Sequence, residues 1–204
     1  MLRRSVARAT VGVLVAAVVG IGVAGCSGED VASLATSSPS ASVSSSPSPS
    51  MVSPEDKAIK KAEAAVRDYY RVVDAALSDP KNFNPEDLKE VAIMSGLYDV
   101  QNARNSYLVE GRHDTGETSV EVVEVRKLDL THKPKAKPQP VVPTVQLMVC
   151  LDSTDVDTVD KNGKSLSSPD RQFRNLVRVG LRNDAYPEGP WRVSYYEFQG
   201  GEPC

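Results

Sequence analysis

The chain has 204 residues and a formal net charge of −3, from 24 Lys and Arg against 27 Asp and Glu. Partners with a phosphate backbone are bound by clustered Lys and Arg, so this weakly acidic composition argues against nucleic acid as a partner. The length allows one domain of ordinary size beside an N-terminal extension.

The N-terminus has the layout of a secretory signal. Arg3, Arg4 and Arg8 precede an uncharged stretch, rich in Val and Ala, over residues 9–24. A basic segment followed by an apolar one is typical of export signals. Two alternatives remain open. The pair of arginines is a feature of twin-arginine signals, and the uncharged residues 9–28 are about long enough to span a bilayer as an uncleaved anchor.

A short motif ends this segment, and it consists of Val23, Ala24, Gly25 and Cys26. An aliphatic residue, two small residues and a Cys resemble the lipobox of bacterial lipoprotein signal peptides. The resemblance implies that a diacylglyceryl group is joined to the Cys26 sulfur and that a signal peptidase removes residues 1–25. Two acyl chains hold a protein firmly on a bilayer. We therefore expect a protein anchored to the extracytoplasmic face of the cell membrane through the lipid on Cys26.

Residues 26–53 have the composition of a linker. Ser and Pro dominate the stretch over residues 37–50, which has little apolar surface to bury. Such a segment cannot offset its ordering entropy, and this predicts disorder. We expect the linker to hold a single folded domain, residues 54–204, away from the membrane.

Two cysteines follow the linker, Cys150 and Cys204. An exported protein meets oxidising conditions that permit disulfides, and this pair lacks the CxxC spacing of a redox site. We expect one structural bridge, which would stabilise the domain by about 3–4 kcal/mol in the chain-entropy description. Two free thiols, with Cys150 simply buried in a strand, are the alternative.

Helical patterns fill the first part of the domain. Ser53 followed by Pro54 and two acids is a strong helix start, and an apolar stripe at helical spacing follows it. Gly96 is expected to separate the second helix from the third, and Gly111 to cap the third. The predicted helices cover residues 54–78, 86–94 and 97–110.

The rest of the domain changes to the alternation of strands. Gly180 interrupts one strand and is expected to mark a bend or bulge. Asn162-Gly163 is the signal of a hairpin with a type I′ turn. Helices followed by strands predict the α+β class, with N-terminal helices packed on a curved antiparallel four-stranded sheet. The predicted strands cover residues 118–130, 145–152, 173–181 and 191–196.

This order of elements resembles the nuclear-transport-factor-2-like cone, a cystatin-like α+β fold. The ending Gly-Pro-Trp-Arg-Val at residues 189–193 is common in that superfamily. Many small actinobacterial lipoproteins look similar, with a lipobox, a Ser/Pro linker and such a domain, and cysteines placed like Cys150 and Cys204 recur in them. The resemblance implies a pocket between the concave sheet face and the long helix, without specifying an activity.

Few side chains point to chemistry. His113 and His132 fall near the ends of elements, beside polar residues, and are interpreted as solvated loop side chains. Asp68 and Asp74 flank the apolar stripe of the first helix and are interpreted as solvated rather than as pocket acids. Six tyrosines are candidates for lining a cavity or filling the core: Tyr69, Tyr70, Tyr98, Tyr107, Tyr195 and Tyr196.

Two charged segments have ordinary explanations. Lysines at residues 127–137 alternate with prolines and are interpreted as a solvated loop, with a weak contact to anionic lipid or wall polymer as the alternative. The lysines are Lys127, Lys133, Lys135 and Lys137.

The second charged segment contains four acids at residues 152–160, and these lack the spacing of a calcium-binding loop.

These patterns predict a non-catalytic module at the cell envelope that binds an envelope protein or a small-molecule ligand. We expect no cofactor, no metal and no catalytic residue, because no motif for nucleophile, metal or phosphate chemistry occurs in the chain. Two alternatives remain open: a pocket enzyme of the isomerase or dehydratase type, and a phage-encoded lipoprotein that excludes superinfecting phage.

Overall fold

The computed structural model describes residues 52–200 and residue 204. The predicted signal, the lipobox residues Val23, Ala24 and Gly25, the predicted lipidation site Cys26 and most of the predicted linker lie outside the described residues. Within the described part, no helix has the length and apolar character needed to cross a membrane.

The long helix α1 (Pro54–Ser78) begins where its sequence predicts. The Ser53 hydroxyl accepts a hydrogen bond from the Asp56 N–H at 3.0 Å, which caps the first turn. One face of the helix is buried, because small and apolar side chains recur along it at helical spacing. The buried residues of α1 are Ala58, Ala62, Val66, Tyr69, Tyr70, Val72 and Ala76.

The boundary between α2 (Glu86–Val91) and α3 (Met94–Glu110) was predicted wrongly. The second helix ends three residues earlier than expected, and Gly96 lies inside α3. The reason is a contact between two residues that lie far apart in the sequence. Ala92 forms a parallel bridge with Val193, so the chain must be extended there. The predicted cap at Gly111 is confirmed, with a left-handed φ of 66°.

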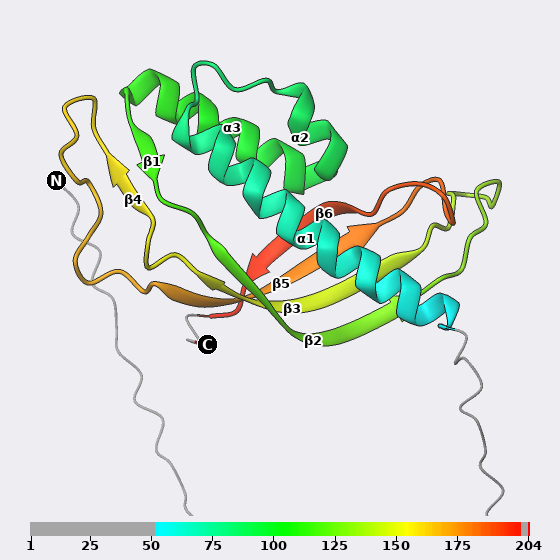
Figure 1. Ribbon diagram of the computed structural model, residues 1–204. Coiled ribbons are helices and arrows are strands. Elements are labelled where there is room, and N and C mark those ends of the chain that lie inside the picture. Colours follow the sequence, from blue (N-terminus) through cyan, green and yellow to red (C-terminus); the bar gives the residue numbers. More distant parts are fainter. Residues whose placement is uncertain (1–51, 201–203) are drawn as a thin grey trace, which may run out of the picture. The chain divides into compact units, whose positions relative to one another are not determined.

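Four antiparallel strands form the main sheet, as predicted, in the order β2-β3-β5-β6. The sheet is curved, and the helices lie over its concave face (Figure 1). The predicted irregularity at Gly180 is confirmed as a register shift between β5 and β6. The Tyr195 ring occupies the place where a side chain at Gly180 would begin. The strands are β2 (Ser119–Asp129), β3 (Thr144–Asp152), β5 (Arg174–Arg182) and β6 (Arg192–Phe198).

A second, two-stranded sheet joins β1 (His113–Thr115) to β4 (Asp157–Val159) and was not predicted. Strands of three residues are too short for alternation to reveal them. His113 therefore begins a strand, where a loop was expected. A hairpin turn does form at Asn162-Gly163, but it is not the predicted type I′ turn. Gly163 has a φ of 78° whereas the φ of Asn162 is not positive, and the Gly163 N–H donates to the Asp160 carbonyl at 2.9 Å, so Lys161 and Asn162 are the central residues.

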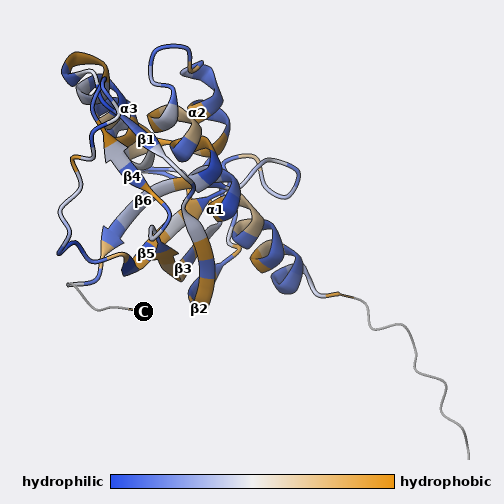
Figure 2. Cartoon of the chain, turned by 60° about the vertical axis from the view of Figure 1, so that its left-hand side comes forward, coloured by the Kyte–Doolittle hydropathy of each residue, from blue (hydrophilic) through white to orange (hydrophobic). Residues whose placement is uncertain are grey.

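The core lies between the helices and one face of the main sheet. Alternate residues of β3 point into it, because successive side chains of a strand lie on opposite faces. Figure 2 shows apolar residues along the helices and strands that enclose this layer. The β3 members of the core are Val145, Leu147, Val149 and Leu151.

Candidate functional site

A small pocket opens on the concave face of the sheet, with a volume of about 150 Å³. Its walls come from α1, α3 and the ends of β3 and β6, so no single segment of the sequence encloses it. Nine of its ten lining residues are apolar or aromatic. The lining residues are Tyr69, Tyr70, Val73, Leu77, Asp99, Val100, Ala103, Leu151, Tyr196 and Phe198.

The tyrosines of this pocket are neutral, and one of them forms a hydrogen bond between helices. The Tyr69 hydroxyl donates to the Gly96 carbonyl at 3.0 Å, which ties α1 to α3. Burial raises the pKa of Tyr69, Tyr70 and Tyr196 above the ordinary value of a phenol. At neutral pH these hydroxyls therefore keep their protons and do not act as bases.

Two pocket residues, Asp99 and Phe198, were not singled out by the sequence reasoning. Asp99 is the one acid among the lining residues, and it is an exposed residue. Phe198 is 60% exposed and contacts Tyr196 edge to face, with 6.0 Å between the ring centres. The alternation of Tyr196 and Phe198 in the last strand is the signal that could have found this aromatic pair.

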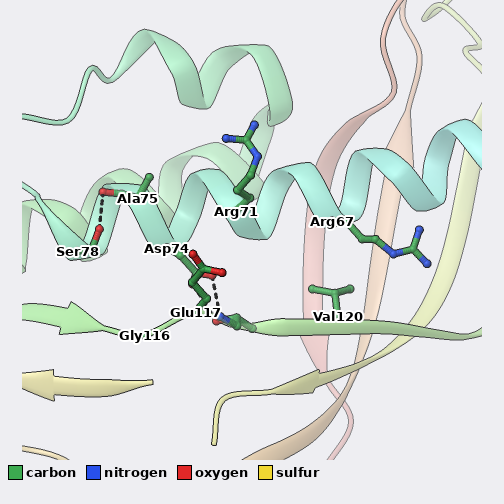
Figure 3. A pocket seen from close by; sticks show the side chains of 9 residues that line it. Arg67, Arg71, Asp74, Ala75, Ser78, Gly116, Glu117 and Val120 are labelled. Atoms are coloured by element: carbon green, nitrogen blue, oxygen red, sulfur yellow. Dashed lines mark hydrogen bonds between the residues drawn. The ribbon is translucent and has the colours of Figure 1, made fainter. Parts of the chain in front are cut away.

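A second and larger cavity, of about 470 Å³, lies between α1 and the start of β2. Asp74 points from α1 toward β2 in this groove, while Arg71 points away from the strand (Figure 3). The Asp74 carboxylate accepts hydrogen bonds from the Thr118 N–H and hydroxyl, both at 2.8 Å. Other lining residues are Arg67, Ala75, Ser78, Gly116, Glu117 and Val120.

The interpretation of Asp74 as a solvated side chain was wrong. The residue is half-buried, and this burial raises the pKa of its carboxyl, against the lowering effect of the two bonds from Thr118. Its position clamps α1 to the β1–β2 connection. Asp68 does lie exposed, as predicted, and its Oδ1 is 2.9 Å from Nη2 of Arg71.

The remaining predicted candidates are spread over the domain and do not form one site. Tyr98 is exposed, and Tyr195 covers Gly180. The Tyr107 hydroxyl donates to Asp114 at 3.0 Å. His132 lies in the β2–β3 loop and is half-buried, with its ring edge to face against Tyr186.

The acids near β4 are engaged in local turns. Asp152, Asp157 and Asp160 accept hydrogen bonds from neighbouring Ser, Thr and backbone groups, and these bonds hold the pKa of each carboxyl below its usual range. Over residues 52–200, no three His, Cys, Asp or Glu side chains gather closely enough to hold a metal ion.

Cys150 and Cys204 are joined, as predicted, with an S–S distance of 2.09 Å and a Cα–Cα distance of 5.7 Å. Leu151 points into the core, so the neighbouring Cys150 side chain lies on the opposite face of the sheet. The bridge therefore fixes the C-terminal residue away from both cavities and is a structural feature.

No protein-family model and no curated protein matches the chain. Among solved structures, the chain is similar to the intermembrane-space region of the chloroplast protein ARC6. The TM-score is 0.43 and the sequence identity 11%, over 68% of this chain and 94% of that chain. A likeness at this level carries no argument about function.

Proposed function

We propose that the protein is a lipid-anchored module on the extracytoplasmic face of the cell membrane, and that its domain binds another envelope protein without catalysis. The lipobox sequence and the Ser/Pro composition of the linker support the anchor. The long helix over a curved antiparallel sheet supports a nuclear-transport-factor-2-like cone as the fold.

The observation that carries the binding function is the size and lining of the pocket on the concave face. Sites for small-molecule ligands are usually cavities of about 300–1,000 Å³. At about 150 Å³, this pocket is too small for such a ligand. It fits one large apolar side chain. Protein partners commonly gain most of their affinity by inserting such an anchor residue into an apolar pocket.

An isomerase or dehydratase function is less well supported. Such reactions need a general acid or base placed against the substrate in the pocket. Asp74 is the one carboxylate in the described residues with a raised pKa, and it lies in the other cavity, bonded to Thr118. The acid of the pocket, Asp99, is an exposed residue.

Photo-crosslinking in the native host tests the binding function. A photoreactive phenylalanine analogue at Phe198 should give a discrete protein adduct, because this ring stands beside the pocket. The same analogue at Val109, which is 88% exposed on α3 and does not line the pocket, is the matched control.

Filling the pocket should remove the adduct. Ala103→Trp places a large side chain in the cavity, while Ala103→Ser leaves it open. The adduct should be lost in the first variant and kept in the second, with equal amounts of folded protein. The proposal is wrong if Phe198 gives no adduct beyond that at Val109, or if Ala103→Trp leaves the adduct unchanged.

A further inference from the structure

The loop between β2 and β3 is strongly basic. From Leu130 to Pro143 it contains three lysines and no acid. All three lysine side chains are exposed, and within the described residues none of them forms an ion pair. Their positive charge is therefore available to an external partner. The lysines are Lys133, Lys135 and Lys137.

Backbone hydrogen bonds hold this loop in a defined shape. The Lys133 N–H donates to the Val141 carbonyl at 2.8 Å, and the Val141 N–H donates back at 3.0 Å. The Ala136 N–H also donates to the Lys133 carbonyl, at 3.1 Å. The three lysines thus project from a small closed hairpin.

The loop lies beside the first turns of α1. His132 packs against Tyr186, with 6.2 Å between the ring centres. Tyr186 in turn lines one cavity together with Pro54, Lys57 and Lys61. In Figure 1 the loop and the start of α1 lie at the same end of the domain. We call the five lysines of this region the basic end: Lys57, Lys61, Lys133, Lys135 and Lys137. The exposed acids Glu55, Asp56 and Glu188 lie beside Lys57 and Lys61, so the excess positive charge comes from the three lysines of the loop.

The opposite end of β3 carries charges of both signs. Residues 152–160 contain four Asp, but Lys161 and Lys164 follow at once, and Arg174 pairs with Asp152. The β2–β3 loop precedes β3 and this acidic segment follows it, so the nine residues of the strand separate the two groups. The pocket on the concave face uses Leu151 and Phe198, near this far end. The lysine-bearing loop and the pocket thus lie toward opposite ends of β3.

We propose that the basic end docks on the anionic phospholipid of the membrane that carries the protein. Clustered lysines attract anionic headgroups, and a lysine ammonium suits a diffuse charged surface because it needs no fixed partner geometry. Docking in this orientation turns the pocket away from the bilayer, toward a partner.

This inference rests on the proposed anchor at Cys26. The chain enters α1 at the basic end, so the tether brings the lysines to the lipid first. A tether also raises the local concentration of the domain at the surface, so that even a weak contact becomes populated. The electrostatic attraction between the lysines and anionic lipid acts over about 8–10 Å at ordinary ionic strength, and this range is then sufficient for docking.

Fluorescence quenching on vesicles tests the docking. The full lipidated protein is reconstituted in vesicles of phosphatidylglycerol and phosphatidylcholine, or of phosphatidylcholine alone, each with a quencher on the lipid headgroup. A fluorophore is attached at Gln139→Cys in the basic loop or, as the control, at Ser168→Cys beyond β4. Both positions are exposed and uncharged.

On the anionic vesicles, quenching should be several-fold stronger at Gln139 than at Ser168. The difference should disappear on neutral vesicles, in high salt, and in the triple variant Lys133→Gln, Lys135→Gln, Lys137→Gln. The variant Lys161→Gln, Lys164→Gln, at the far hairpin, should retain it.

The outcomes separate the docking from the anchor. Protein that floats with both kinds of vesicle but is quenched equally at the two labels contradicts the docking alone. An unchanged difference in the triple variant, or an equal difference on neutral vesicles, contradicts it as well. Protein that floats with neither kind of vesicle contradicts the anchor and the docking together.

Discussion

Two aspartates on α1 illustrate how position decides the behaviour of a single residue. Asp68 and Asp74 flank the same helix, and the sequence pattern assigned both to a solvated surface. Only Asp74 meets a partner outside its own helix, because Thr118, 44 positions further along the chain, lies beside it. A carboxylate that bridges two elements contributes to the fold, whereas one that faces solvent contributes little.

Asp74→Ala should destabilise the domain by about 1–3 kcal/mol, because the half-buried Thr118 donors lose their acceptor. Urea unfolding at neutral pH measures the change. Asp68→Ala is the matched control and should lie within about 0.5 kcal/mol of the wild type. Equal effects of the two substitutions would show that the clamp between α1 and the β1–β2 connection contributes nothing.

The pH dependence of Asp74→Asn follows from the raised pKa. In the wild type, the folded protein keeps the Asp74 proton to a higher pH than the unfolded chain does. Between the pKa of Asp74 in the unfolded chain, about 4, and its higher pKa in the folded protein, the folded state binds more protons than the unfolded state. The contribution of Asp74 to the free energy of unfolding therefore falls as pH rises through this window. Asn retains an acceptor for Thr118 without the charge. Unfolding free energies should therefore shift in favour of the variant as pH rises from about 3 to 7, and a shift in the other direction would contradict the assignment.

At the scale of elements, α3 and β6 are held together by an unusually close contact. A Cβ atom at Gly96 would lie 2.7 Å from the Val193 carbonyl oxygen, which is closer than real Cβ atoms approach. The Ile93 N–H donates to the same carbonyl at 2.9 Å, so the strand has little room to move. The glycine thus permits the helix to approach the edge of the sheet.

Gly96→Ala should destabilise the domain by about 1–3 kcal/mol through this clash, although alanine favours a helix by about 1 kcal/mol. Asn105→Ala, at an exposed position of the same helix, should instead be neutral or slightly stabilising. Thermal and urea unfolding of the two variants compare the effects. A stabilised Gly96→Ala protein would mean that α3 packs more loosely on β6 than described.

Local signals in the sequence predicted some elements well and others not at all. The start of α1, the four main strands and the Gly180 irregularity depend on neighbouring residues, and all were predicted correctly. The hairpin at Asn162-Gly163 was also predicted, although with the wrong turn type. The end of α2 depends on a pairing of Ala92 with Val193, a contact that no local pattern reveals. A pocket between the sheet and the long helix was expected from the resemblance, and Tyr69, Tyr70 and Tyr196 do line it. Asp99 and Phe198 were missed, because the pocket walls converge from four elements.

At the scale of the whole molecule, the described domain has two different ends. The basic end lies where the chain enters α1, and the pocket lies toward the other end of β3. The disulfide between Cys150 and Cys204 fixes the C-terminus on the other face of the sheet. A membrane anchor at the N-terminal side would suit this arrangement, because it leaves the pocket accessible to a partner.

Mass spectrometry of the intact protein, extracted from membranes of its host, tests this account most directly. The mature chain should begin at Cys26, carry a diacylglyceryl group on that residue, and contain a disulfide between Cys150 and Cys204. A Cys26→Ala variant should lose the lipid mass and leave the membrane fraction. A membrane-bound protein that retains residues 1–25, with Cys26 unmodified, would contradict the account.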